Sequence, residues 1–310
     1  MANWRKGQPV RFVPLSQATG RVLDVYRDMQ QLLGVPHIGS FFQFLGGHPR
    51  FLDRFWSVVR PIVQSKEFFS CSTRLRANAY TRIHTYFEVP SLELVRQQFD
   101  PAVSEELKEC IDLFYDSLPM SLLLASLLSE AFEGPAGSAN ILITPAPPLK
   151  PHRLFEIADE ESAPPPVKAI YADIRSATSA DVLYNIYRAF GRWPGLLRSY
   201  WTLVRPIAVS ELFQYCGNSV QEDALAIVSE LPGPVEFSSA DLAELGMNQS
   251  AAGSLTRGTN MFVHSLAAAL LNVSLARIAM EGGSVRHNSI TGESPAAVTL
   301  EAKLPYEKAS

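Results

Sequence analysis

The feature that most constrains the fold is an internal repeat. The stretch RFWSVVRPIVQSKEFFSC at residues 54–71 returns 145 residues later as SYWTLVRPIAVSELFQYC at residues 199–216. The ungapped match extends from residues 25–71 onto residues 170–216. A period of this length is far longer than a solenoid unit. The repeat therefore predicts a duplicated domain whose two copies pack as an intramolecular pseudo-dimer.

A second match shows that the duplication extends towards the C-terminus. DLFYDSLPMSLLLASLLSEAFEG at residues 112–134 aligns with NMFVHSLAAALLNVSLARIAMEG at residues 260–282, now with an offset of 148. The change of three residues in the offset places a small insertion in the segment between the two matches. The copies therefore cover most of the chain.

The pattern of apolar residues inside each copy is helical. VLDVYRDMQQLL, residues 22–33, has apolar residues three and four positions apart, which is the period of one helix face. Pro61 and Pro206 are expected to end or kink their helices, because proline has no amide donor. Arg60 and Arg205, just before these prolines, are expected to satisfy helix C-terminal carbonyls. Strand signals are scarce, and NILIT at 140–144 is isolated, so we expect an all-α fold.

Proline-rich and polar segments divide the chain. Residues 134–168 are dense in proline and small residues, which excludes a regular helix or a central strand. Long helices are expected over 66–86, 102–133, 211–230 and 251–280. The predicted organisation is an N-terminal arm at 1–20, helical repeats at 21–133 and 169–282, a connecting arm at 134–168 and a polar tail at 283–310.

Composition excludes several classes of protein. The formal charge of −4 argues against nucleic acid as a partner, because phosphate binding needs clustered Lys and Arg. No uninterrupted apolar run reaches the roughly 20 residues of a membrane span, and the N-terminus lacks the apolar core of a signal peptide. The three cysteines form no CxxC and no metal-ligand spacing. We therefore expect a cytoplasmic protein with reduced thiols and no metal or other cofactor.

The repeated segments YRDMQQLLGVPHIGSFFQFLGGHPRFLDRFWSVVRP and YADIRSATSADVLYNIYRAFGRWPGLLRSYWTLVRP, with the proline-rich arm between them, resemble the group I 2-haloacid dehalogenases. The resemblance covers roughly residues 20–282. It implies two helical repeats with an active site between them, and cofactor-free action on both enantiomers of short 2-halocarboxylic acids. The repeat is also similar, more distantly, to the alkylhydroperoxidase fold, but the CxxC of that redox chemistry is absent.

The chain departs from this family at the catalytic position. The resemblance implies an aspartate that activates water, early in the helix of the second repeat that contains Tyr187. The residues just before Tyr187 are Tyr-Asn-Ile, at 184–186, and none is a carboxylate. Asp181 lies further back, where it is expected to cap the helix. Because an asparagine cannot deprotonate water at neutral pH, the family reaction would need another base here.

Polar residues in the long helices provide one candidate for that base. Asp112 is equivalent to Asn260, and Asp116 to His264, so each helix carries its pair on one face at a spacing of four. If the two helices face each other, Asp116 would orient His264, and an imidazole held in this way is suited to act as a general base. The alternative is that the aspartates are solvated and that His264 is a hydrogen-bonded interior residue.

The junction between loop and helix in each copy provides the second candidate. Its side chains are His37, Ser40 and Phe41 in GVPHIGSFF, and Tyr184, Asn185 and Tyr187 in ADVLYNIYR. Ser40 and Asn185 are equivalent, and a helix N-terminus with free amides suits a carboxylate or a departing halide. The alternative is ordinary capping by Ser40 and Asn185 and packing by the aromatic residues.

Three interpretations therefore remain open. The chain is a dehalogenase-like hydrolase with a shifted base, a related enzyme with different chemistry on a carboxylic-acid-like or larger apolar substrate, or a catalytically silent binder of a small molecule. Each implies a small-molecule partner, a carboxylic acid for the first, and a monomer or a homodimer. The candidate catalytic residues are Asn185, Tyr187, His264 and Asp116, and the candidate substrate-binding residues are His37, Ser40, Phe41, Tyr184 and Asn260.

Overall fold

The regular structure is entirely helical in the part of the chain that is described. The computed structural model describes residues 11–97, 99–155, 157, 160–178 and 183–284, and within them no strand forms. The all-α prediction is confirmed. The NILIT stretch belongs to no strand; the nearest ladder contact is an isolated bridge between Ser65 and Pro145.

The helix bounds repeat along the chain. The first copy contains α1 (Gly20–Leu33), α2 (Ser40–Gly46), α3 (Pro49–Val63), α4 (Lys66–Tyr86), α5 (Glu93–Arg96) and α6 (Pro101–Glu133). The second contains α7 (Pro165–Thr178), α8 (Asn185–Phe190), α9 (Pro194–Ala208), α10 (Glu211–Val228), α11 (Ser239–Glu244) and α12 (Gln249–Met280). Helices α7 to α10 begin 145 residues after α1 to α4, and α12 begins 148 residues after α6. Both sequence offsets are therefore reproduced by the helices.

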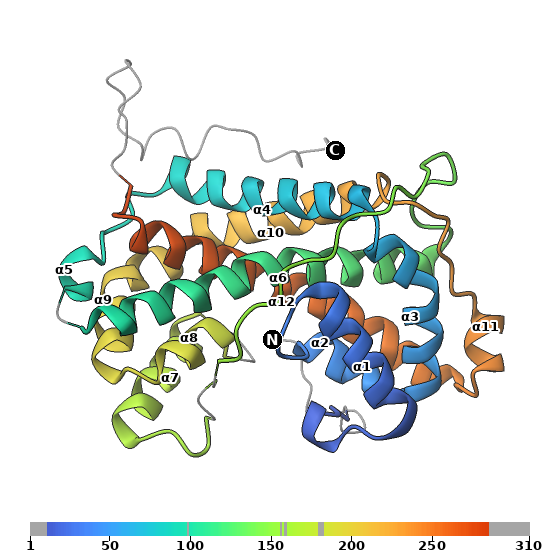
Figure 1. Cartoon of the computed structure of the whole chain (residues 1–310), viewed down its shortest axis with the longest axis horizontal. Helices are drawn as coiled ribbons and strands as arrows, with labels where there is room; N and C mark the ends of the chain where they lie inside the picture. The colour runs from blue at the N-terminus through green and yellow to red at the C-terminus, as the bar shows by residue number, and fades with distance from the viewer. Residues whose placement is uncertain (1–10, 98, 156, 158–159, 179–182, 285–310) are drawn as a thin grey trace, which may run out of the picture.

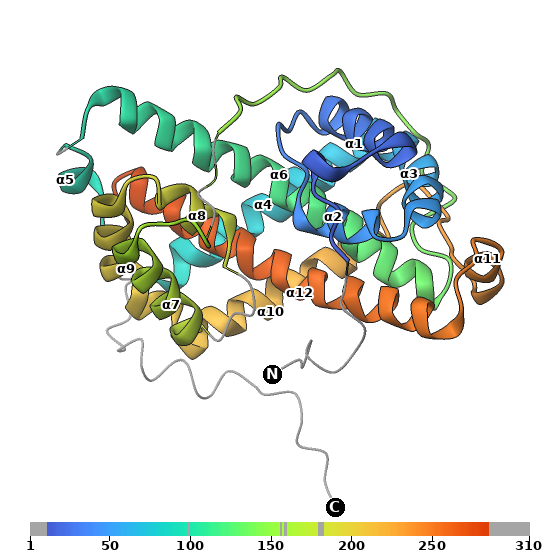
Figure 2. The same cartoon turned by 90° about the horizontal axis from the view of Figure 1, so that it is seen from below.

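The two groups of short helices lie at opposite ends of the molecule. Figure 1 shows α1, α2 and α3 at one end and α7, α8 and α9 at the other, with the long helices α6 and α12 crossing between them. Helices α4 and α10 lie side by side over α6 and α12. This arrangement leaves α2 and α8 on the same side of the crossing helices, which is the side seen in Figure 2.

The WxxxRP stretch joins α3 to α1 through one carboxylate. The indole Nε1 of Trp56 donates to Oδ2 of Asp28 at 2.7 Å, and the guanidinium of Arg60 donates to both carboxylate oxygens, at 2.7 and 3.1 Å. The hydrogen bonds from Arg60 hold the pKa of Asp28 below its usual range. The prediction that Arg60 satisfies helix carbonyls was therefore wrong: its bound acceptor on α1 is a side chain.

The second copy repeats this contact between α9 and α7. Trp201 donates to Oδ2 of Asp173 at 2.6 Å, and Arg205 donates to the same carboxylate at 3.1 and 3.5 Å. Hydrogen bonds from Trp201 and then Arg205 lower the pKa of Asp173. The identical Asp, Trp and Arg of the two copies thus perform one structural task twice, holding the first helix of each copy against the third.

A tyrosine in each copy explains the repeated glycine. The buried hydroxyl of Tyr26 donates to the backbone carbonyls of Val13 and Phe42, and a Cβ at Gly46 would overlap that hydroxyl. In the second copy the Tyr171 hydroxyl lies equally close to Gly191. Glycine is required at both positions because the tyrosine hydroxyl occupies the space of a side chain.

The repeated proline lies in the last turn of its helix and does not end it. Helix α3 continues for two residues beyond Pro61, and α9 for two beyond Pro206. The next helix is then started by a serine, since Ser65 accepts from the amide of Phe68, as Ser210 does from that of Phe213. The repeated serine and phenylalanine are therefore a cap and its first buried side chain.

Contacts between the copies are reciprocal. Arg277 on α12 donates to Asp112 on α6 at 2.7 Å, and the equivalent positions, Ser129 on α6 and Asn260 on α12, are joined by a hydrogen bond of 2.7 Å. Asn78 on α4 donates at 3.1 Å to Asp223, which is its own equivalent on α10. Reciprocal contacts of this kind are expected of two copies around an approximate twofold axis, and the pseudo-dimer itself stays a prediction.

The connecting segment follows the first copy before it reaches the second. Backbone hydrogen bonds join it to the first copy. The amide of Lys66, at the start of α4, donates to the carbonyl of Thr144, and the amide of His152 donates to the carbonyl of Gly34, just after α1. Helix α7 begins at Pro165, inside the segment predicted as an arm, because proline is tolerated in the first turn of a helix. The tail from 285 onwards lies outside the described residues, and the division into arms and repeats stays a prediction.

Helices α6 and α12 are long and apolar enough to cross a membrane, judged by length and composition alone. The prediction from the sequence rested only on uninterrupted apolar runs and therefore did not include this. In the fold, 72% of the most apolar window of α6 and 56% of that of α12 are buried. Packing of the two helices against each other and against α4 and α10 accounts for this apolar character. The absence of a membrane partner, the cytoplasmic location and the oligomeric state stay predictions.

We expect Gly46→Ala to destabilise the fold by about 1–3 kcal/mol, the range for an overpacked core. The added methyl group would displace the Tyr26 hydroxyl from its two carbonyl acceptors. Combining it with Tyr26→Phe should give less destabilisation than the sum of the two single changes in urea unfolding. Gly217→Ala is the control, since its Cβ would lie 3.7 Å from Leu271; additivity of the first pair would contradict the steric account.

We expect the stabilising effect of Asp28 to be lost in acid. A carboxylate whose pKa is lower in the folded than in the unfolded protein stabilises the fold above its ordinary pKa of 3.8, and this contribution disappears as the pH falls through the folded value. The difference in unfolding free energy between wild type and Asp28→Asn should therefore shrink when urea titrations at pH 6 are repeated near pH 3. A constant difference would show that the charge of Asp28 is unimportant.

Candidate functional site

A cleft of about 760 Å³ lies where α2 and α8 approach the crossing helices α6 and α12. We call it the central cleft. Its walls come from residues 12–15, α2, α6, α8, α12 and the loops that precede α2 and α8. Its described polar side chains are His37, Ser40, Gln43, Ser117, Ser121, Thr178, Tyr184, Asn185, Arg188, His264 and Ser265. Most of the remaining wall is aromatic or aliphatic, so the cleft suits a ligand with both polar and apolar parts.

Aromatic packing holds α2 in the wall of the cleft. The ring of Phe262 on α12 lies 5.7 Å from the ring of Phe41 and 5.4 Å from that of Phe44, measured between centroids. A Cβ at Gly258 would overlap the Phe44 ring, so the glycine lets α2 approach α12 closely. Phe41, predicted to bind substrate, therefore lines the cleft and also joins the core between the two helices.

The second copy contributes the more polar wall. Asn185 and Arg188 both line the cleft, and Nη1 of Arg188 donates to Oδ1 of Asn185 at 3.3 Å. Tyr184 lies beside them, and burial raises the pKa of its hydroxyl to about 12, so that hydroxyl stays protonated at neutral pH. The structure thus brings Tyr184 and Asn185 together, as the sequence predicted, and adds a guanidinium group.

The first copy contributes a neutral wall. His37 and Ser40 line the cleft as predicted, and burial lowers the pKa of the His37 imidazole, partly offset by a backbone hydrogen bond at Phe155. The Nε2 atom of His37 is buried without a hydrogen-bond partner among the described residues. Gln43 uses its amide group to donate to the carbonyl of Ile38 at 2.8 Å. At neutral pH this wall carries polar groups without a positive charge.

Sequence reasoning missed Arg188, the one arginine among the described residues that line the cleft. It is equivalent to Gln43 in the first copy, so the copies differ in charge at the same place in the wall. A comparison of the copies at this pair would have identified it, just as it singled out Ser40 and Asn185. Because a guanidinium binds a carboxylate through parallel hydrogen bonds, the cleft has one wall suited to an acid.

The predicted partnership of Asp116 and His264 does not form. Arg76 on α4 and His152 of the connecting segment bind Asp116, the latter at 3.3 Å between Nε2 and Oδ2. His264 lines the cleft, and its Nδ1 lies 3.2 Å from Oε1 of Gln221 on α10. The prediction was wrong because the two side chains contact different neighbouring helices, Asp116 reaching Arg76 on α4 and His264 reaching Gln221 on α10.

Tyr187 and Asn260 lie outside the described lining of the cleft. Tyr187, a residue of α8, is fully buried, and its hydroxyl donates to Oδ1 of Asn272 on α12 at 2.6 Å. Burial raises the pKa of this hydroxyl well above the usual range. Asn260 accepts from Ser129 where α6 and α12 cross. Both side chains have structural partners in the fold, and neither is positioned by the structure to meet a ligand in the cleft.

The junction helices are too short for the dipole argument made from the sequence. Helix α2 has seven residues and α8 has six, fewer than two full turns each. Neither Ser40 nor Asn185 caps its helix, since each is the first helical residue and the caps are Gly39 and Tyr184. Anion binding in the cleft therefore has to come from side chains.

Among the described residues, neither an aspartate nor a glutamate lines the cleft. Asp181, the acid nearest to the family's catalytic position, lies outside the described residues. No group of three or more His, Cys, Asp or Glu residues that could hold a metal ion occurs in the described part of the chain. Among the described residues that line the cleft, His37 and His264 are those with a nitrogen atom that can accept a proton.

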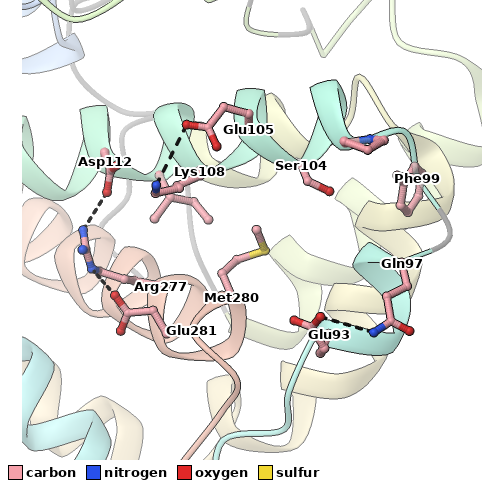
Figure 3. A pocket seen from close by; sticks show the side chains of 12 residues that line it. Glu93, Gln97, Phe99, Ser104, Glu105, Lys108, Asp112, Arg277, Met280 and Glu281 are labelled. Carbon is pink, nitrogen blue, oxygen red and sulfur yellow. Dashed lines mark hydrogen bonds and ion pairs between the residues drawn. The ribbon is translucent and has the colours of Figure 1, made fainter.

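A second cavity, of about 820 Å³, opens between α5, the start of α6 and the end of α12 (Figure 3). Most of its charged side chains are paired with each other: Arg277 binds Asp112 at 2.7 Å and Glu281 at 2.9 Å, and Lys108 lies 3.9 Å from Glu105. Such mutual pairing leaves little driving force for a charged ligand. Its slightly larger volume therefore does not make it the better site, and six of the nine predicted site residues line the central cleft: His37, Ser40, Phe41, Tyr184, Asn185 and His264.

Comparison with known proteins places the chain near the haloacid dehalogenases. A family model described as halocarboxylic acid dehydrogenase DehI matches residues 35–185. An (R)-2-haloacid dehalogenase of Pseudomonas putida is 23% identical over 273 residues, covering 86% of this chain and 91% of that protein. A configuration-inverting 2-haloacid dehalogenase of Pseudomonas sp. (strain 113) is 23% identical over 278 residues, covering 86% and 89%.

Solved structures give the same picture for the fold. A mutant D-2-haloacid dehalogenase in complex with D-2-CPA superposes with a TM-score of 0.81 at 21% identity, covering 87% of this chain and 96% of that one. A D-2-haloacid dehalogenase in complex with L-LA superposes with a TM-score of 0.79 at the same identity, covering 87% and 96%. The chain is thus haloacid dehalogenase-like in sequence and in fold over most of its length.

We expect Tyr187→Phe to lower stability by about 1–3 kcal/mol, because it leaves the buried Oδ1 of Asn272 without a donor. The equivalent pair in the first copy is Phe42 and Leu124. Tyr187→Phe combined with Asn272→Leu should therefore recover most of the loss, which thermal and urea unfolding would measure. If Tyr187 instead acts in the cleft, the single variant will change ligand affinity while its stability stays unchanged.

Proposed function

We propose that this protein is a cofactor-independent hydrolase that replaces the halogen of a 2-halocarboxylic acid by a hydroxyl group in the central cleft. The similarity to haloacid dehalogenases over most of the chain supports this proposal. The observation that carries it is the Asn185–Arg188 pair, which gives one wall of a largely apolar cleft a positively charged group.

The carboxylate of the substrate is held at the wall of the second copy. Arg188 offers several N–H donors in a planar group, and Asn185, already bonded to it at 3.3 Å, has an amide N–H₂ that can donate to the same ligand. The first copy has Gln43 and Ser40 at these positions, so the acid is held at one end of the cleft. The orientation of C2 then follows from the position of the carboxylate.

The apolar walls serve the substitution step. A water molecule attacks C2 from the side opposite the halogen: its oxygen forms a bond to C2, the halide leaves with the bonding electron pair, and one proton of the water is released. Rings such as Phe41 and Phe262 exclude bulk water from the cleft. In such surroundings the attraction between the Arg188 guanidinium and a carboxylate is stronger than in water. Water and substrate supply all the atoms, which is why no cofactor is needed.

Direct attack by water inverts the configuration at C2. We propose the (R)-acid as the preferred substrate, on the basis of the (R)- and D-specific relatives, in place of the action on both enantiomers that the family resemblance implies. (R)-2-chloropropionate would then give (S)-lactate. The configuration-inverting relative supports the same stereochemical course.

The test is incubation of the purified, folded protein with each enantiomer of 2-chloropropionate and 2-bromopropionate. We expect halide release from the (R)-acid and formation of (S)-lactate in equal amounts, unaffected by a chelator. Binding without halide release, seen as a thermal shift with either acid, would contradict the hydrolase and favour a silent binding protein. Release with retention of configuration would contradict direct attack by water.

We expect Arg188→Gln, which installs the residue of the first copy, to raise KM for (R)-2-chloropropionate. Losing one charge-assisted hydrogen-bonded contact of about 1.5–3 kcal/mol corresponds to an increase of about 10- to 100-fold. Arg198→Gln, an exposed arginine on α9, is the control and should leave KM unchanged. An unchanged KM in Arg188→Gln would exclude this side chain as the carboxylate anchor.

A further inference from the structure

One contact between neighbouring helices has been kept in both copies while its chemistry has changed. In the first copy Arg76 on α4 donates to Asp116 on α6. The equivalent residues are Gln221 on α10 and His264 on α12, and these two side chains also meet, at 3.2 Å. Both copies therefore keep a side-chain contact at this position. In the first copy it joins a guanidinium to a carboxylate, and in the second it joins an amide to an imidazole.

The surroundings of the two pairs differ as well. Asp116 is bound from a second side by His152 of the connecting segment, at 3.3 Å, so its carboxylate is occupied by two partners. His264 is exposed and lines the central cleft, where Asn185 and Arg188 also lie. The first-copy pair thus fastens the connecting segment to α6, while the second-copy imidazole faces the space that holds a ligand.

The contact with Gln221 orients the imidazole of His264. An amide oxygen only accepts hydrogen bonds, so the 3.2 Å contact with Oε1 of Gln221 is a hydrogen bond in the tautomer of His264 that carries its proton on Nδ1. The Nε2 atom of the neutral ring then keeps its lone pair. A histidine oriented through Nδ1 in this way is arranged as a general base.

We propose that Nε2 of His264 is the base that activates water in the central cleft, and that Gln221 is the residue that positions it. The proposal rests on the proposed hydrolysis of 2-halocarboxylic acids. Nε2 takes a proton from water as the water oxygen bonds to C2, the C2–halogen bond breaks, and the halide departs with the electron pair. The products are the 2-hydroxy acid, the halide and a proton on His264, which is released to solvent.

This assignment accounts for the described lining of the cleft. No carboxylate is present among its described residues, and an asparagine stands at position 185. The other imidazole of the lining, His37, has its Nε2 buried out of reach of solvent, so a water molecule has no access to that atom. His264 combines exposure to the cleft with a fixed ring orientation.

The first experiment compares His264→Ala with His84→Ala, an exposed histidine on α4 that does not line the cleft. General bases contribute about 10²- to 10⁴-fold to rate, so we expect kcat of His264→Ala to fall at least about 100-fold with little change in KM. Added imidazole should restore part of the activity. A kcat within twofold of wild type, or a loss without rescue that parallels a loss of thermal stability, would overturn the proposal.

The second experiment tests the positioning role. Gln221→Leu should lower kcat by about 10-fold, since the ring loses its acceptor but not its place on α12. Gln221→Glu keeps an acceptor and should retain activity, and Gln214→Leu, an exposed glutamine on the same helix, is the control. Equal losses in the Leu and Glu variants of residue 221 would overturn the role of the hydrogen bond.

Two further measurements separate this proposal from the proposed function. Nitrogen-15 NMR of the imidazole should show Nδ1 of His264 protonated and Nε2 unprotonated at neutral pH, with Nε2 responding to added (S)-lactate. Asp181→Asn should leave kcat largely intact. If wild type releases halide while His264→Ala does so equally well, or only Asp181→Asn is inactive, the hydrolase stands and the base assignment falls; absence of halide from wild type overturns both.

Discussion

The packing of α6 against α12 is the constraint on which the rest of the molecule depends. These two helices are long and apolar because each is surrounded by the other, by α4 and by α10. Their side chains form reciprocal contacts, such as Asp112 with Arg277 and Ser129 with Asn260. Everything that forms the cleft is attached to this crossing, with α2 held on α12 through Phe262 and α8 held on it through Tyr187 and Asn272.

Several residues that the copies share proved to be structural, and several residues in which the copies differ line the cleft. The shared Asp28, Trp56 and Arg60 clamp one helix to another, and Gly46 makes room for Tyr26. In contrast, the cleft takes Asn185 and Arg188 from one copy and Ser40 and Gln43 from the other. In a duplicated fold, the packing that both copies need is served by shared residues. Positions in which the copies differ can then serve ligand binding.

The helices and their repetition could be predicted from the sequence because periodicity and identical motifs report directly on packing. The helices expected at 66–86 and 102–133 agree with α4 and α6 to within one residue. The Asp116–His264 partnership could not be judged in the same way, since sequence spacing says which residues share a helix face but not which neighbour that face meets. The real partners, Arg76 and Gln221, lie on helices that sequence analysis had not placed beside them.

Duplication within one chain has a consequence that two separate subunits could not achieve. Identical subunits around a twofold axis would present the same residue at positions 43 and 188, so a guanidinium on one wall would face a second one on the other. An acid could then bind in two opposed directions, and two like charges would repel across the empty space. Because a single chain encodes both halves, the two walls of the cleft differ in charge, with Arg188 on one and Gln43 on the other, so the two orientations of a bound acid are no longer equivalent.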